Sequence, residues 1–122
     1  MTGAAASSAF TIDVSREPTG LRVRITGDAN MDAVDPLGEA LARAHEDAVS
    51  GRANEVVVDL KQLEFMNSAC FKKLVTWITK VEAVLADSRY RIRFLSNPKM
   101  HWQRRSLPAL QCFAMDIVSV ET

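Results

Sequence analysis

The segment 65–74, FMNSACFKKL, places an amide, a hydroxyl and a thiol directly before a helix-like pattern of residues. A small polar residue there can cap the helix, because its side-chain oxygen accepts a hydrogen bond from an unpaired backbone N–H. The same helix end favours added negative charge, which suits a phosphate on Ser68. It can also lower the pKa of a thiol such as Cys70 and so produce a nucleophile. The sequence predicts a cap at Asn67 or Ser68 and leaves the phosphate and the nucleophile as alternatives.

Catalysis by this segment would need a base within hydrogen-bond reach of the nucleophile. The only two histidines are His45 and His101, and neither lies near residues 68–70 in the sequence. A packed, unreactive thiol is therefore the expected role of Cys70. The acidic residues show no metal-ligand spacing, and no glycine-rich phosphate loop is present. The sequence predicts a protein that is not an enzyme and has no cofactor and no metal site; a thiol enzyme or redox sensor built on Cys70 is the outside alternative.

Length and composition limit the classes of protein further. The 122 residues fit one compact domain, and we expect a flexible tail at 1–8 followed by a single domain at 9–121. Fifteen basic residues balance fifteen acidic ones, whereas nucleic-acid-binding domains usually carry a basic excess. The sequence contains no signal peptide and no apolar run of the roughly 18 residues that a membrane span needs. Cys70 and Cys112 match no redox or metal spacing. We expect a cytoplasmic protein that binds no nucleic acid and does not insert into a membrane.

The spacing of apolar residues predicts an alternation of strands and helices. Alternating strands at 10–15 and 21–26 flank EPTG at 17–20, whose proline and glycine favour a turn, so an antiparallel hairpin is expected. The later elements are a helix at 36–50, a strand at 55–60, a helix at 68–85, a strand at 90–96, a helix from 97–98 and a strand at 115–120. Strand–helix–strand units favour parallel pairing. The sequence therefore predicts an α/β domain with a mixed sheet and the order β-β-α-β-α-β-α-β.

Proline residues mark the boundaries of the first and last predicted helices. Asp35-Pro36 and Asn97-Pro98 each join a cap residue to a proline, which suits the first helical position because it lacks an N–H. Pro108 is expected to end or kink the last helix. These three prolines set the expected helix boundaries.

Two further features allow both a structural and a functional interpretation. Trp77 falls beside the main apolar stripe of the middle helix, and core packing is favoured over an exposed binding residue. A solvated face of one strand and one helix is the favoured interpretation of a basic cluster, and contact with phosphate groups or an acidic partner is the alternative. The cluster consists of Arg89, Arg91, Arg93, Lys99, Arg104 and Arg105.

Taken together, VVVDL at 56–60 and LEFMNSACFKKLV at 63–75 resemble the central signature of the STAS family. That family includes domains of sulfate transporters and the bacterial anti-sigma factor antagonists. Its signature is an apolar strand ending in Asp-Leu, a short spacer, an apolar pair, and then Asp-Ser-Ser/Thr-Gly opening a helix. VRITGDANM at 23–31 and IRFLSNP at 92–98 also resemble family segments, so the likeness covers nearly the whole chain. The resemblance implies a STAS-like mixed sheet of four to five strands with helices packed on it.

The resemblance also implies a switch that this sequence lacks. In the antagonists, the second hydroxyl residue of the signature is phosphorylated by a partner kinase that is also the anti-sigma factor, and the phosphate weakens binding. Here Asn67 stands at the family Asp and Ser68 at the first Ser. Ala69 stands at the phosphoacceptor position and Cys70 at the Gly. Because Ala69 has no hydroxyl, the usual switch cannot operate there.

The preferred hypothesis is a STAS-type module that regulates transcription through protein–protein contact and is not switched at the usual site. The alternatives are phosphorylation at Ser68 by a partner kinase, or a role as a scaffold or transport-complex subunit. The expected partner is an anti-sigma factor/serine kinase or a related regulator, and a homodimer is possible. We expect the partner to contact the start of the second helix and the adjacent loop at 27–32. The predicted partner-binding residues are Asp28, Asn30, Met66, Asn67, Ser68, Ala69, Lys72 and Lys73.

Overall fold

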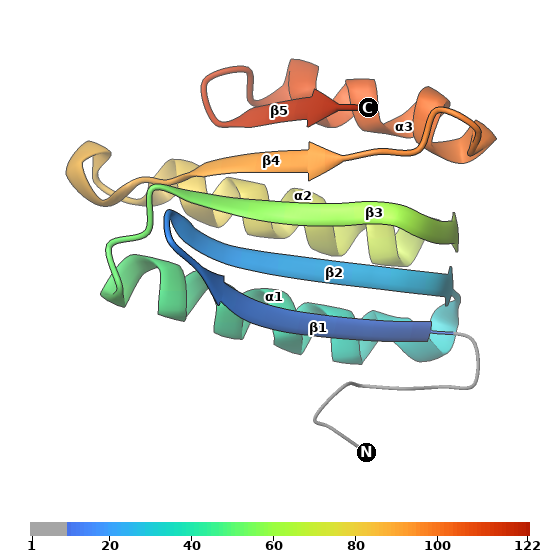
Figure 1. The fold of residues 1–122 in the computed structure, drawn as a ribbon, viewed down its shortest axis with the longest axis horizontal. Coiled ribbons are helices and arrows are strands. Elements are labelled where there is room, and N and C mark those ends of the chain that lie inside the picture. Colours follow the sequence, from blue (N-terminus) through green and yellow to red (C-terminus); the bar gives the residue numbers. More distant parts are fainter. Residues whose placement is uncertain (1–9) are drawn as a thin grey trace.

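The computed structural model describes residues 10–122, so the tail predicted at 1–8 lies outside the described residues. Five strands form one sheet in chain order (Figure 1). The strands are β1 (Phe10–Glu17), β2 (Gly20–Ala29), β3 (Glu55–Met66), β4 (Arg91–Leu95) and β5 (Val118–Glu121). The helices are α1 (Val34–Ser50), α2 (Ser68–Ala83) and α3 (His101–Phe113), with short 3-10 turns η1 (Met31–Ala33) and η2 (Ala86–Ser88). This order confirms the predicted succession of strands and helices.

The chain opens with the expected antiparallel hairpin. β1 pairs with β2 from Phe10↔Gly27 to Glu17↔Gly20, and the turn between them holds the proline that the sequence placed there. Gly20 has a φ of 157°, and a Cβ at this position would lie 1.9 Å from the backbone oxygen of Glu55. Only glycine therefore fits where the hairpin turn meets the start of β3.

The remaining strands run parallel, as the strand–helix–strand pattern predicts. β2 pairs with β3, β3 with β4 and β4 with β5, each in parallel register, and a helix connects each pair. All three helices lie behind the sheet in Figure 1, so one face of the sheet carries no helix. Among residues 10–122, no helix combines the length and apolar character needed to cross a membrane.

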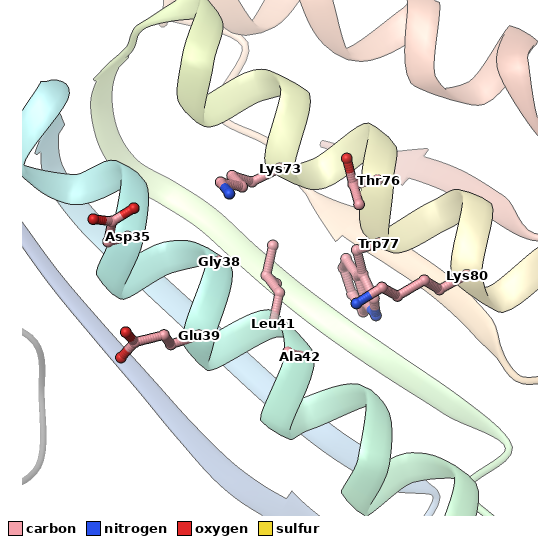
Figure 2. A pocket seen from close by; sticks show the side chains of 9 residues that line it. All are labelled: Asp35, Gly38, Glu39, Leu41, Ala42, Lys73, Thr76, Trp77 and Lys80. Atoms are coloured by element: carbon pink, nitrogen blue, oxygen red, sulfur yellow. The ribbon is translucent and has the colours of Figure 1, made fainter.

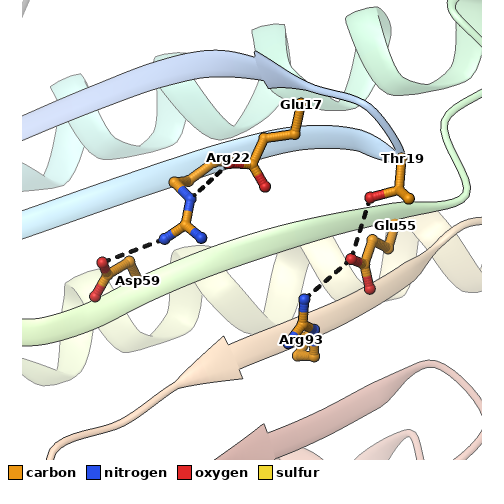
Figure 3. A network of polar contacts seen from close by, with 6 residues as sticks. All are labelled: Glu17, Thr19, Arg22, Glu55, Asp59 and Arg93. Atoms are coloured by element: carbon orange, nitrogen blue, oxygen red, sulfur yellow. Dashed lines mark hydrogen bonds and ion pairs between the residues drawn. The ribbon is translucent and has the colours of Figure 1, made fainter.

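The helix-free side of the sheet, called the open face below, is held by paired charges. Val57 is only 1% exposed, because its register partners on the two sides are Arg22 and Arg93. The Arg22 guanidinium lies 2.9 Å from Glu17 and 3.4 Å from Asp59 (Figure 3). The aliphatic part of an arginine covers apolar surface while its charged end stays in solvent. Two arginines thus replace the second helical layer that a parallel sheet usually needs.

The second arginine repeats this arrangement. Arg93 donates to Glu55 at 3.1 Å, and Glu55 also accepts a hydrogen bond from Thr19 at 3.3 Å (Figure 3). Arg93 also donates to Glu121 at 3.1 Å. These contacts link the starts of β3 and β4 to the end of β5. Arg22 and Arg93 are therefore neutralised on the open face by carboxylates of neighbouring strands.

The opposite face of the sheet packs on the helices and forms the core. α1 buries the predicted stripe of Leu37, Leu41, Ala44 and Ala48. α2 buries Leu74, Ile78 and Val81, while Phe71 and Val75 are only partly buried. It also buries Trp77, which confirms the core interpretation of that residue.

Leu85 is 81% exposed, although the sequence predicts a helix over 68–85 with this apolar residue at its end. α2 ends at Ala83, and Val84 already has an extended backbone with a ψ of 145°. Leu85 therefore lies beyond the end of the helix, and its side chain does not follow the helical spacing that would direct it to the core.

The two predicted helix starts with a cap and a proline were also wrong. α1 begins at Val34 with Ala33 as its N-cap, because η1 leads directly into it, so Asp35 lies in the first turn and does not cap. α3 begins only at His101, because the Asn97 side chain accepts from the Lys99 N–H at 2.9 Å and closes a separate turn. Both motifs lie close to the start of a helix, but the residue at which the helix begins depends on the chain that precedes it.

Other boundaries shift for comparable reasons. Pro108 lies inside α3, which continues to Phe113. Because proline has no N–H, the backbone carbonyl four residues earlier lacks its helical partner, and the exposed position of Pro108 places that carbonyl toward solvent. β3 continues six residues beyond the predicted end at residue 60, because irregular pairing with β2 carries the ladder to Ala29↔Met66. β5 begins at Val118 rather than at 115, after a turn closed by the Ile117 N–H on the Ala114 carbonyl at 3.0 Å.

Candidate functional site

The ends of β2 and β3 bring the predicted site segments together. Asp28 pairs with Phe65 and Ala29 with Met66, and the Asn67 N–H donates to the Ala29 carbonyl at 2.9 Å. η1, which follows β2, also contacts α2. The loop after β2 and the start of α2 therefore form one surface at the carboxyl end of the parallel strands, where open α/β sheets commonly bind their ligands.

Asn67 caps α2, as the sequence predicts. Its Oδ1 accepts a hydrogen bond from the Cys70 N–H at 2.8 Å, and its backbone is extended with φ −76° and ψ 169°. Ser68 is the first residue of α2 and is exposed, whereas Ala69 is half-buried. The cap of α2 is therefore the side-chain amide of Asn67, and Ser68 remains exposed to solvent.

Cys70 is fully buried beneath this surface. Its Sγ donates to the Asn30 carbonyl at 3.5 Å and so ties α2 to the loop after β2. Burial raises the pKa of the Cys70 thiol, and the nearby Lys73 opposes this only in part. A thiol held protonated and closed off from solvent is a poor nucleophile. These observations support the packing role expected for Cys70.

Six of the eight predicted partner-binding residues meet at the carboxyl end: Asp28, Asn30 and residues 66–69. Met66 is 8% exposed, so its side chain belongs mainly to the core. Lys72 is exposed one turn further along α2.

Lys73 lies elsewhere. Its side chain lies so close to Gly38 that a Cβ added to this glycine would be 3.2 Å from the Lys73 Cδ and Cε. Lys73 thus lines the groove between α1 and α2. Figure 2 shows its side chain directed toward α1. The structure therefore separates Lys73 from the surface to which the sequence assigned it.

Two apolar residues of this surface are absent from the predicted set. Met31 is 69% exposed at the start of η1, and Phe65 is 43% exposed near the end of β3. The alternation of side chains along a strand directs Phe65 outward because its neighbour Met66 is directed inward, and this was the available signal. We define the carboxyl-end patch as Met31, Phe65, Ser68 and Ala69.

A buried polar cluster lies beneath α2, distant in sequence from the patch. The Tyr90 hydroxyl accepts from the Trp77 Nε1–H at 2.8 Å and lies 2.7 Å from His45 Nδ1. Burial raises the Tyr90 pKa, so this hydroxyl keeps its proton, and it donates to His45 Nδ1 in the neutral tautomer that carries its proton on Nε2. Burial also lowers the His45 pKa, and the charge of Lys80 lowers it further. This cluster satisfies the indole N–H and explains how Trp77 can be buried.

The basic cluster in the last third of the sequence serves mainly to hold the fold. Arg93 forms the ion pairs of the open face, and Arg89 donates to the carbonyls of Glu82 and Val84 at 2.9 and 3.1 Å. Arg104 donates to the Pro98 carbonyl at 3.0 Å. Within residues 10–122, no three His, Cys, Asp or Glu side chains gather as metal ligands would.

No protein-family model matches the sequence, and no curated protein matches it significantly. Similarity to solved structures is clear. An anti-sigma factor antagonist from Mycobacterium paratuberculosis superposes with a TM-score of 0.69 at 18% identity, over 95% of this chain and 88% of that one. The chain has the fold of the anti-sigma factor antagonists. The STAS-like fold that the sequence predicts is thereby confirmed.

Two further structures of this fold differ in their chemical state. The phosphorylated form of SpoIIAA, a Bacillus cell fate determinant, has a TM-score of 0.60 at 18% identity, over 93% of this chain and 92% of that one. The anti-sigma factor antagonist SpoIIAA in its unphosphorylated form has a TM-score of 0.58 at 19% identity, over 81% and 82% of the two chains. At these identities the likeness concerns the fold, and function must be argued from the site.

Proposed function

We propose that this protein is a non-enzymatic, cytoplasmic regulatory module that binds a protein partner through the carboxyl-end patch. The partner is an anti-sigma factor with serine kinase character or a related regulator. In this proposal, binding is not switched by phosphorylation at the family position, which Ala69 occupies. Three lines of support are the fold, the chemistry of α2 at its start, and the exposed apolar residues beside it.

The observation that carries the proposal is the exposure of Met31, in the turn after β2, and of Phe65, two residues before the Asn67 cap of α2. Large apolar side chains that stay exposed at one place on a soluble domain commonly mark an interaction site. A methyl group at position 69 keeps the adjacent surface uncharged, whereas a phosphate would add about −1.5 to −2 units of charge there. The patch is thus suited to continuous binding, with any control exerted on the partner.

A substitution that restores charge at position 69 tests this function. Ala69→Glu should weaken partner binding at least about tenfold, because it places a carboxylate within the interface. The domain should stay folded, since the first turn of a helix favours an acidic residue. The partner would first be recovered by affinity purification of the tagged protein from its own host, and its affinity then measured by calorimetry.

Ala109→Glu is the matched control, because Ala109 is an exposed alanine in α3 and the change adds the same carboxylate elsewhere. Its affinity for the partner should equal that of the parent protein. Equal affinity of Ala69→Glu and the parent would place the interface outside the carboxyl-end patch.

Phosphorylation of Ser68 is a second candidate, supported by the exposure of its hydroxyl at the start of α2. A shift of one residue turns a side chain by about 100° around the helix axis, so a kinase would approach from a different direction. Intact-mass measurement on protein from its host, with a Ser68→Ala variant for comparison, distinguishes the two. A phosphate that is lost in the variant would replace the unswitched function with a displaced switch.

A further inference from the structure

A groove separates α1 from α2 on the helical side of the molecule (Figure 2). Its volume is about 290 Å³, and its floor is formed by Leu41, Ala42 and Trp77. Asp35 and Glu39 lie along the α1 rim. Lys73 and Lys80 lie along the α2 rim, with Thr76 between them. One wall of the groove is therefore acidic and the other is basic.

The two rims do not neutralise each other. Among residues 10–122, every ion pair within 4.0 Å involves Arg22 or Arg93 on the open face, and none involves the four charged residues of the groove. A Cβ at Gly38 would lie 3.2 Å from the Lys73 Cδ and Cε, so the absence of a side chain there leaves room for this lysine. The acidic residues of α1 and the lysines of α2 thus line the groove without an ion pair between them.

We infer that the groove is the interface of a symmetric dimer formed by two copies of this chain. α1 and α2 each follow one of two parallel strands, β2 and β3, and therefore run in the same direction. A twofold axis parallel to these helices places α1 of one copy over α2 of the other. Such an axis leaves every residue at its own height along the helix. Lys73, which lies opposite Gly38, therefore meets the stretch of the second copy's α1 that carries Asp35 and Glu39, whereas Lys80 lies about 10 Å further along, near His45.

The charge pattern selects this symmetry among the possible ones. A twofold axis across the helices would place α1 on α1, and Asp35 and Glu39 would then face the same acidic residues of the second copy. Like charges in such contact are unfavourable. The axis along the groove forms two identical sets of attractive contacts, as an isologous interface requires.

The dimension of the surface indicates a weak, salt-sensitive association. Helices of 17 and 16 residues are about 25 Å long at 1.5 Å per residue. Two adjacent helices of this length offer a contact at the lower end of the range for specific interfaces. Leu41 and Trp77 are each 2% exposed, so little apolar surface remains to be buried. Attraction between the rims should therefore supply most of the association, and salt should screen it.

Reciprocal charge reversal tests this dimer. The double variant Asp35→Lys/Glu39→Lys has two basic rims, and Lys73→Glu/Lys80→Glu has two acidic rims. Sedimentation equilibrium at low salt should show a dimer for the parent protein at micromolar concentrations. Each double variant alone should associate at least about tenfold more weakly, whereas an equimolar mixture of the two should regain the parental association as a heterodimer.

Two results would overturn the inference: a monomeric parent protein over the whole concentration range, or a mixture that associates no better than its components. Circular dichroism of each variant verifies that it is folded. Exposed Glu46→Lys, also on α1 but outside the groove, is the charge control and should associate as the parent does. Because the groove is separate from the carboxyl-end patch, Ala69→Glu should remain dimeric, and loss of partner binding can be distinguished from loss of the dimer.

Discussion

The open face and the carboxyl end of the same sheet use charged and apolar side chains in opposite ways. On the open face, Arg22 and Arg93 meet carboxylates on both sides and cover the one apolar residue between them, Val57. At the carboxyl end, Met31 and Phe65 stay exposed. A surface whose groups are satisfied internally gains little from a partner, whereas exposed apolar groups gain from being covered. The difference favours a stabilising role for the open face, and it is the basis for proposing that a partner binds at the carboxyl end.

Removal of Phe65 should have the largest effect and should act on binding. Phe65→Ser is expected to weaken partner binding by about 2 kcal/mol, the size typical of an aromatic residue central to an interface. Its free energy of unfolding should change by about 0.5 kcal/mol or less, because an exposed side chain contributes little to stability. Calorimetric titration with the partner and urea denaturation measure the two quantities.

Phe113 provides the matched control for that change. It is 48% exposed, close to the 43% of Phe65, but lies at the end of α3. Phe113→Ser should leave binding unchanged. Equal losses of partner affinity in the two variants would show that exposed aromatic residues bind nonspecifically rather than through one patch.

Removal of Arg93 should have a smaller effect and should act on stability. Arg93→Met leaves Glu55 and Glu121 without their common partner, and should lower the free energy of unfolding by about 1 kcal/mol or less, the usual range for exposed ion pairs. The side-chain length is retained, so the cover over Val57 persists. Urea denaturation measures the change at low and high salt, and the difference from the parent should shrink as salt rises.

Arg91→Met is the comparison for this residue, because Arg91 is exposed on the same strand and forms no ion pair with the described residues. It should have no measurable effect on stability. A loss of partner binding in Arg93→Met would contradict the division between the two surfaces.

The smallest effect concerns pH and the half-buried His45. Its pKa in the folded protein is lowered below 6.5 by burial and by Lys80, so the unfolded chain takes up a proton on this residue before the folded protein does. His45 therefore makes stability fall as the pH drops below about 6.5, and it has no such effect at higher pH. Urea denaturation on either side of this pH should reveal the slope.

Replacement of His45 by Gln should remove that slope. The control is His101→Gln, which changes an exposed imidazole and should retain the dependence of the parent. If both variants keep the same slope, protonation elsewhere in the chain is responsible.

Local patterns predicted much of the fold because each depends on near neighbours. Alternating residues placed β1 and β2, and the three-and-four spacing placed the buried stripe of α1. The errors at the helix ends share one cause. Asp35, Asn97 and Leu85 lie at helix ends, where the exact boundary depends on η1, on a side-chain turn, or on the exit of the chain toward β4.

The candidate site was predictable in part for the same reason. The capping of α2 by Asn67 is a contact over three residues, and it was visible in the sequence. The exposure of Met31 beside α2 and the departure of Lys73 toward α1 depend on how separate elements pack, so no local pattern indicated them.

The sequence by itself determined what is absent at the start of α2. Ala69 has no hydroxyl in any conformation, so covalent chemistry alone excludes a phosphate on this residue. Only the tertiary structure decided which groups are satisfied and which remain available. It buried Cys70 and Trp77 with their polar partners, and it paired Arg22 and Arg93 on the open face with carboxylates. It left Met31 and Phe65 exposed, and it left the charged rims of the groove without ion pairs to the described residues. The physical reason is that burial and charge pairing are properties of neighbours in space, which residues distant in sequence supply.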